Sequence, residues 1–123
     1  LLEKSRISSQ AKGERNYHIF YQLFEAQHLK RRYGLSHPEN YRYTNQSGCI
    51  QVVGVNDRQE HDDVVIAMRD LGFSEEEKEW IFDVVAAVLF LGNIEFATKK
   101  IKGTTGSQIT NIDQLRNAAK FLR

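Results

Sequence analysis

The sequence predicts a mainly α-helical fold in one domain, and two observations support this prediction. Apolar residues recur at the spacing of a helix face in several long stretches, whereas strand-like segments are short. The segment Ser74–Glu77 has the serine and glutamate pattern that starts a helix. With 123 residues, no internal repeat and no long linker, the chain has the length of one compact unit. We therefore expect a single domain over residues 1–123.

The composition excludes several classes of protein. Lys and Arg number 17 against 16 for Asp and Glu, and a net charge of +1 argues against a dedicated nucleic-acid-binding protein. The single Cys49 cannot form an internal disulfide, which fits a reducing compartment. The longest apolar run, Val84–Leu91, is too short to cross a membrane, and no signal-peptide pattern opens the chain. Because the first residue is Leu1 rather than Met, we expect a piece of a longer protein.

Residues 1–9 are predicted to form a strand, in which Leu2 and Ile7 are the only strong apolar anchors. An isolated strand leaves its backbone N–H and C=O groups without partners. We therefore expect the partner strands to be missing from the chain or distant in it. Gly13 marks the break before the first helix.

The apolar spacing predicts a long helix over residues 14–32, ended by Gly34. Acidic Glu14 at its start and basic Lys30–Arg32 at its end both suit the helix dipole. So wide an aromatic face requires cover, which we expect from elements outside this short chain. The face consists of Tyr17, Phe20, Tyr21 and Phe24, at positions i, i+3, i+4 and i+7.

Residues 36–54 show no sustained period and are predicted to form a connection. Pro38 biases the residue before it towards an extended conformation. Residues 45–48 are typical of a turn, and residues 49–53 are compatible with a short extended piece.

Two further helices are predicted next. The first begins at a capping residue, Asn56 or Asp57, and runs to about Leu71. The second begins at Ser74, whose hydroxyl can accept from the backbone N–H of the glutamate that reaches back to it. Its second half is apolar on all sides, which predicts burial, and Gly92–Asn93 ends it.

The C-terminal part is predicted to be mixed. Residues 95–98 are expected to be extended, and residues 102–107 to form a mobile, exposed loop. A last helix is predicted to begin near Thr110 or Asn111. Its apolar stripe consists of Ile112, Leu115, Ala119 and Leu122.

No segment carries a recognisable phosphate-binding or metal-binding motif. A P-loop needs G-x-x-x-x-G-K-[ST], but the glycines in residues 102–107 are three apart and no lysine follows the second. The histidines have no zinc-site spacing, and a lone cysteine removes thiolate ligand sets. The histidines are His18, His28, His37 and His61.

The remaining polar clusters have simpler explanations than catalysis. The carboxylates of residues 75–79 start a helix, those of residues 61–63 point in different directions, and Cys49 lacks an orienting partner. Basic Lys30–Arg32 suits a helix C-terminus, and the sequon Asn45–Ser47 matters only in a secreted protein. We therefore expect no catalytic, cofactor-binding or metal-binding residue in this chain.

Four blocks of the sequence together resemble the motor head of myosins, in the order of that family and with similar gaps. They are Leu1–Arg6 with Gly13–Leu23, Tyr41–Cys49, Asp70–Ser74 and Ala86–Phe96. The departures are modest. Thr44 stands where Leu is usual, Phe90 replaces a His, residues 25–32 are more charged than the expected turn, and residues 99–108 lie where family members vary.

The resemblance implies a fragment of a P-loop motor head, mainly of its upper actin-cleft subdomain. Residues 1–9 would be the remnant of a transducer β-strand, and residues 14–123 the mostly helical upper subdomain. The parent would be an actin-activated Mg-ATPase that moves along actin filaments. Its P-loop, switch I and switch II do not occur here, since switch I would lie shortly before Leu1 and switch II well after Arg123.

The resemblance also implies partners and a location. The fragment would contact the rest of the head, would reach actin through the parent, and would hold neither ATP nor Mg²⁺ itself. Neither nucleic acid nor a membrane is an expected partner. Residues 1–23 would couple the nucleotide-bound sheet to the actin cleft in the cytoplasm, on the cytoskeleton. Exposed parental contact surfaces would favour self-association of the isolated chain.

Two alternatives stay open at this point. The first is a free-standing helical protein-interaction module that docks a partner through the aromatic face of residues 14–32. The second is nucleic-acid binding through Lys30–Arg32, which predicts salt-sensitive binding to polynucleotides.

Overall fold

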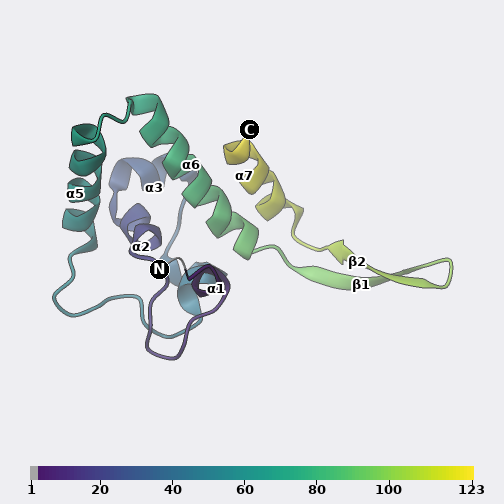
Figure 1. Ribbon diagram of the computed structural model, residues 1–123. Helices are drawn as coiled ribbons and strands as arrows, with labels where there is room; N and C mark the ends of the chain where they lie inside the picture. Colours follow the sequence, from purple (N-terminus) through teal and green to yellow (C-terminus); the bar gives the residue numbers. More distant parts are fainter. Residues whose placement is uncertain (1–2) are drawn as a thin grey trace.

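The computed structural model describes residues 3–123 as a helical body from which a two-stranded ribbon projects (Figure 1). The mainly α-helical class is confirmed. In chain order the elements are α1 (Ser5–Ser8), α2 (His18–Glu25), α3 (Gln27–Tyr33), the 3₁₀ helix η1 (Pro38–Asn40), α4 (Arg42–Asn45), α5 (Asp57–Asp70), α6 (Glu75–Gly92), β1 (Phe96–Ile101), β2 (Thr104–Ile109) and α7 (Ile112–Leu122).

The strand predicted for residues 1–9 is wrong where the structure describes it. Residues 5–8 form α1, and residues 1–2 lie outside the described residues. A strand needs a neighbour for its backbone hydrogen bonds, but in the described part of the chain β1 and β2 pair only with each other. A helical turn satisfies these groups locally, and the ion pair between Arg6 and Glu3, at 2.8 Å, supports it.

The helix predicted over residues 14–32 is divided into α2 and α3. The break is at Ala26, whose ψ of 97° is not helical. The carbonyl of Glu25 at the break accepts a hydrogen bond from the guanidinium of Arg58 in α5, at 3.3 Å. The predicted stop at Gly34 is confirmed, since its φ of 64° lies in the left-handed region that glycine adopts most readily.

The aromatic face of α2 lies inside the molecule. Phe20, Tyr21 and Phe24 are only 2–4% exposed. The ring centroid of Phe24 lies 5.1 Å from that of Tyr41, which lies 5.9 Å from that of Phe90 in α6. The expectation that this face needs cover from outside the chain is therefore wrong, because the chain's own elements bury it.

The connection between α3 and α5 contains two short helical turns. Pro38 opens η1, where its missing N–H leaves no hydrogen bond unmade. The α4 turn extends to Asn45, the first residue of the predicted 45–48 turn. Residues 49–53 pair with no other strand.

Helices α5 and α6 begin at the predicted capping residues. The Asn56 side chain accepts a hydrogen bond from the backbone N–H of Gln59, at 3.1 Å. The Ser74 hydroxyl accepts from the N–H of Glu77 at 3.1 Å, and the Glu77 carboxylate accepts from the N–H of Ser74 at 2.8 Å. The predicted end of α6 at Asn93 is also confirmed.

The mobile loop predicted for residues 102–107 is wrong, because these residues belong to an antiparallel hairpin in which Ile101 lies opposite Thr104. The two turn residues, Lys102 and Gly103, have φ values of 48° and 79°. Two positive φ values define the type I′ turn, which matches the twist of paired strands. Threonine and isoleucine on both sides of this turn favour strand conformation. The extended segment expected over residues 95–98 is confirmed from Phe96 onward, where β1 (Phe96–Ile101) begins.

Helix α7 packs along α6 and completes the core. Ala118 is fully buried. The ring of Phe121 meets the ring of Tyr33 edge-on at 4.9 Å and stacks against Phe90 at 6.0 Å. The helix begins one residue after Asn111, as predicted.

Substitution of Gly92 by alanine tests the packing of α6 against α4. A Cβ at this position would lie 2.7 Å from carbons of the Tyr43 ring. We expect Gly92→Ala to lower the free energy of unfolding by about 1–3 kcal/mol in urea denaturation, because the ring must shift. Gly106→Ala is the control, since its Cβ would meet only the Lys99 carbonyl at 3.7 Å. Equal stability of both variants would contradict the expectation.

Candidate functional site

The residues considered for chemistry from the sequence lie apart from one another. Lys102 and Gly103 form the tip of the hairpin, the glutamates of residues 75–77 start α6, and Cys49 is half-buried before α5. Among residues 3–123, no group of three or more His, Cys, Asp or Glu side chains is placed to hold a metal ion. In the same range, no helix is both long and apolar enough to span a membrane.

Only two of the four histidines meet. The rings of His28 and His61 lie 5.9 Å apart, between α3 and α5. His18 instead accepts a hydrogen bond from Arg15 through Nδ1, at 2.6 Å. His37 is exposed beside η1. The histidines therefore form no common site.

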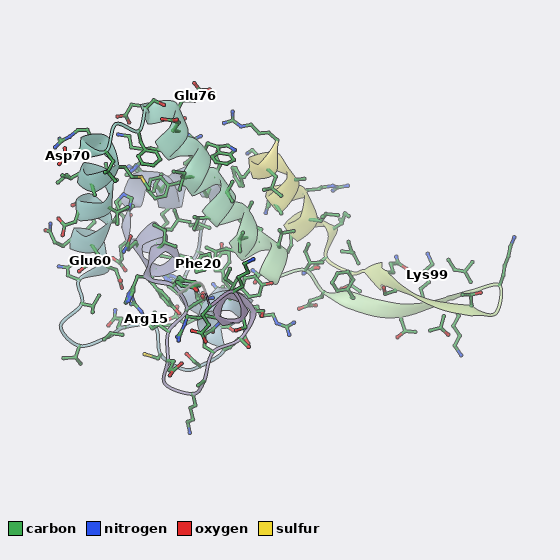
Figure 2. All side chains as sticks on the ribbon, in the orientation of Figure 1. Arg15, Phe20, Glu60, Asp70, Glu76 and Lys99 are labelled. Carbon is green, nitrogen blue, oxygen red and sulfur yellow. The ribbon has the colours of Figure 1, made fainter. Side chains whose placement is uncertain are left out.

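The most connected charged side chain in the body is Arg15, which precedes α2 (Figure 2). Its side chain is 3% exposed and donates two hydrogen bonds, each of 2.8 Å, to the two carboxylate oxygens of Asp57 at the start of α5. It also donates to the carbonyl of Ile50 at 2.9 Å. The guanidinium lies 4.1 Å from the centre of the Tyr21 ring, within the range of a cation–π interaction.

The next residue, Asn16, ties the same loop to two other segments. Its side-chain N–H₂ group donates to the carbonyl of Ile7 at 2.9 Å and to the carbonyl of Tyr43 at 2.8 Å. Its backbone N–H donates to the hydroxyl of Tyr21 at 3.0 Å. Asn16 is 2% exposed, so these bonds are made away from water.

We call these two residues and their partners the Arg15–Asn16 junction. It joins helices α1, α2, α4 and α5 and the loop at Ile50. Sequence reasoning placed both residues in a family motif without giving them a role. No periodic pattern pairs Arg15 with Asp57, which is 42 residues away. A charged residue directly before an aromatic helix was the only available signal.

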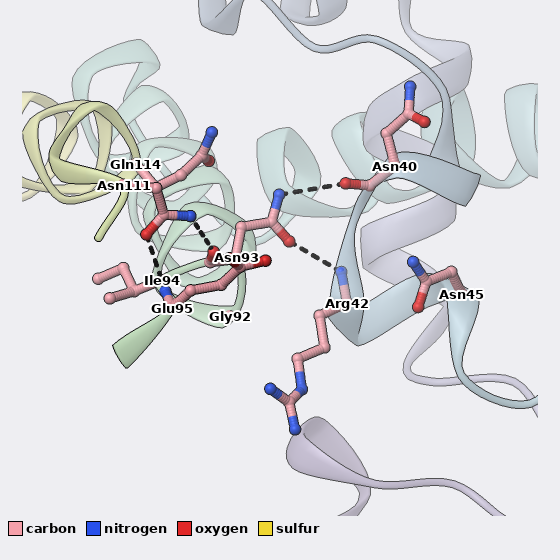
Figure 3. A pocket seen from close by; sticks show the side chains of 9 residues that line it. All are labelled: Asn40, Arg42, Asn45, Gly92, Asn93, Ile94, Glu95, Asn111 and Gln114. Carbon is pink, nitrogen blue, oxygen red and sulfur yellow. Dashed lines mark hydrogen bonds between the residues drawn. The ribbon is translucent and has the colours of Figure 1, made fainter. Parts of the chain in front are cut away.

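A second polar tie closes the base of the hairpin beside a pocket of about 400 Å³ (Figure 3). The Asn93 side chain accepts from the backbone N–H of Arg42 at 2.8 Å and donates to the carbonyl of Asn40 at 3.2 Å. The Asn111 side chain donates to the carbonyl of Asn93 at 2.7 Å and accepts from the N–H of Glu95 at 2.8 Å. These amides are used within the protein to hold α4, α6 and α7 together.

Asp83 is a third polar tie, in the middle of α6 and 1% exposed. Its carboxylate accepts from the hydroxyl of Tyr33 at 2.8 Å, from Arg32 at 3.3 Å and from Arg123 at 3.1 Å. Burial, together with the neighbouring carboxylate, raises the pKa of Tyr33 above its ordinary value, so the phenol stays a hydrogen-bond donor. Three donors around one buried acid explain its presence without catalysis.

The buried imidazole of His61 makes no hydrogen bond through Nδ1. It is 2% exposed and packs against the ring of Phe82 at 5.4 Å. Burial, and secondarily the nearby His28, lowers the pKa of His61, and the charged groups beside it on α5 are Arg58 and Asp62. A neutral imidazole therefore belongs to the folded state.

Comparison with known proteins decides which family this arrangement belongs to. The sequence profile of the myosin head (motor domain) matches residues 1–123. The chain belongs to the myosin head family. It is 46% identical over 125 residues to a myosin-I heavy chain of Dictyostelium discoideum, covering 99% of this chain. It is 48% identical over 98 residues to the myosin ID heavy chain of the same organism, covering 78% of this chain.

The relatives are much longer than this chain. The myosin IC heavy chain of Acanthamoeba castellanii is 45% identical over 107 residues, which is 85% of this chain and 9% of that protein. The matched part is 5% of the Dictyostelium myosin-I heavy chain and 9% of the myosin ID heavy chain. The chain therefore corresponds to a small part of a myosin head, as the four motif blocks predicted.

Conversion of Arg15 to lysine tests the junction in this myosin fragment. A lysine keeps the charge but loses the two-pronged contact with the Asp57 carboxylate. We expect Arg15→Lys to lower the free energy of unfolding by about 2–3 kcal/mol, measured by chemical denaturation. Arg69→Lys is the matched control, because the Arg69–Asp70 pair is exposed and should change stability by less than about 0.5 kcal/mol.

The buried His61 predicts a specific pH dependence of stability. Its pKa is lowered in the folded state from 6.5, so the unfolded chain binds the proton more readily. The contribution of His61 to the free energy of unfolding is therefore complete above pH 6.5, and it is lost as the pH falls below this value. Thermal melts between pH 7.5 and 5 should show a steeper loss for the natural chain than for His61→Gln. The exposed His37→Gln should retain the natural slope.

Proposed function

We propose that this chain is a coupling segment of an ATP-driven actin motor, linking the nucleotide-binding part of the head to the actin cleft. Membership of the myosin head family supports the motor. The observation that carries the coupling role is the Arg15–Asn16 junction, in which two adjacent side chains hold five segments. A displacement of α1 then acts directly on Asn16, and through the neighbouring Arg15 on α5.

We further propose that the longer protein is an actin-activated Mg-ATPase of the cytoplasmic cytoskeleton. Within it, residues 14–123 would form most of the upper actin-cleft subdomain and would contact the rest of the head. ATP and Mg²⁺ would be held by that remaining part, because this sequence carries no P-loop. Mg-ATP hydrolysis by the isolated chain above background would contradict this division of roles.

The alternative of a free-standing helical module depended on an aromatic docking face. Phe20, Tyr21 and Phe24 of that face are buried in the chain's own core, so no observation favours this alternative. Self-association of the isolated chain remains a separate proposal. It is supported by exposed apolar side chains such as Leu71 and Trp80, 78% and 61% exposed, and light scattering after size exclusion tests it.

The coupling role can be tested in a complete myosin head that contains this segment. The Arg15→Lys variant should keep the basal Mg-ATPase rate, while activation of that rate by actin falls about fivefold or more. The physical reason is that the loosened junction no longer couples the nucleotide-binding part of the head to the actin cleft. Both rates are measured by steady-state phosphate release.

The matched control is Phe121→Leu, which should destabilise the same body at α7, because the Phe121 ring packs on Tyr33 and Phe90 rather than on the junction. Loss of actin activation in Arg15→Lys alone supports coupling through the junction. Equal loss of actin activation in both variants would mean that lower stability alone explains the loss. This result would contradict the coupling role. Loss of the basal rate in Arg15→Lys would also contradict it.

A further inference from the structure

The hairpin is a basic segment of the chain. Residues 96–110 contain Lys99, Lys100 and Lys102 and no acidic residue, whereas the whole chain has a net charge of only +1. Every residue of β1 and β2 is exposed except the half-buried Ile109. Figure 2 shows Lys99 on the ribbon, far from the helical body. An enzyme can therefore reach this segment from either face.

The strand register places one hydroxyl directly opposite a lysine. Thr105 pairs with Lys100 across the ladder, and paired residues of antiparallel strands point to the same face. Lys102 precedes Thr105 by three residues. Thr105 thus has a basic residue upstream in sequence and another beside it in space.

We propose that Thr105 is a phosphorylation site for a serine/threonine kinase that selects basic residues on the N-terminal side of its acceptor. The Thr105 hydroxyl oxygen attacks the γ-phosphorus of ATP, and the bond from this phosphorus to the oxygen bridging to the β-phosphate breaks. ADP leaves, and the hydroxyl proton passes to the catalytic aspartate of the kinase. The acceptor segment enters the kinase easily, because a two-stranded ribbon without a third strand is only marginally stable and opens at little cost.

The other hydroxyls of the hairpin fit this recognition less well. Thr98 precedes the three lysines, and Ser107 lies opposite Thr98 rather than a lysine. Thr104 is opposite the apolar Ile101. Among these hydroxyl residues, only Thr105 has both a lysine three residues before it in the sequence and a lysine opposite it on the other strand. The register therefore distinguishes Thr105 from its neighbours.

Phosphorylation would change both the charge and the order of the ribbon. A phosphate adds about −2 at neutral pH, which takes the hairpin from three positive charges to about one. The phosphate oxygens lie within reach of the Lys100 ammonium and form charge-assisted hydrogen bonds across the strands. The modified ribbon is then more ordered and attracts acidic surfaces less strongly.

The test uses the whole chain with ATP and the catalytic subunit of cAMP-dependent protein kinase, and it locates phosphate by tandem mass spectrometry. The natural chain and the control Ser107→Ala should each gain one phosphate on Thr105, and Thr105→Val should gain none. Lys102→Asn removes the upstream charge with a residue that tolerates the positive φ, and it should slow the reaction about tenfold. All three positions are exposed and outside the core, so the variants keep the fold.

Phosphate on another residue, or an unmodified natural chain, would overturn the proposed site. Hydrogen exchange provides the second readout. Phosphorylation should slow exchange of the β1 and β2 amides in the natural chain, but not in Lys100→Gln, which lacks the cross-strand partner. Equal protection of the two phosphorylated proteins would overturn the pairing with Lys100.

Discussion

The buried contact between Arg15 and Asp57 is the interaction on which the helical body depends. Both groups carry full charges in a largely dry environment, so each is costly to bury without the other. Their two parallel hydrogen bonds fix the distance and the angle between the loop before α2 and the start of α5. The aromatic core supplies most of the burial, but apolar contacts alone tolerate small rotations of one helix against another.

The other polar ties extend this fixed geometry to the rest of the molecule. Asn16 connects the loop before α2 to α1 and to α4. Asn93 and Asn111 together join α4, α6 and α7. Asp83 gathers donors from α3 and from the end of the chain around α6. Each tie satisfies buried polar groups that would otherwise destabilise the core. These ties oppose small rotations of one helix against another, as the proposed coupling role requires.

Features that depend on neighbouring residues were predictable from the sequence, and features that depend on distant ones were not. The capping of α6 at Ser74 and the end of α3 at Gly34 are local, and both predictions are confirmed. The Arg15–Asp57 pair spans 42 residues, so no spacing rule reveals it. The strand expected over residues 1–9 is wrong at residues 5–8 for the same reason, because a strand exists only where a partner supplies hydrogen bonds. The hairpin had a local signal in its Lys102–Gly103 turn, but that segment was interpreted as a flexible loop.

The closed base of the hairpin has a consequence for how the chain tolerates change in length. The backbone N–H of Thr110 and the side chain of Asn111 both bind Glu95, so the two strands leave the body at a fixed point. Beyond that point every residue of the two strands is exposed except the half-buried Ile109, and none belongs to the core. Residues can therefore be inserted or removed near the tip at Gly103 while the body keeps its geometry. The ribbon is a natural insertion point, at which related heads can diverge and a reporter peptide can be grafted.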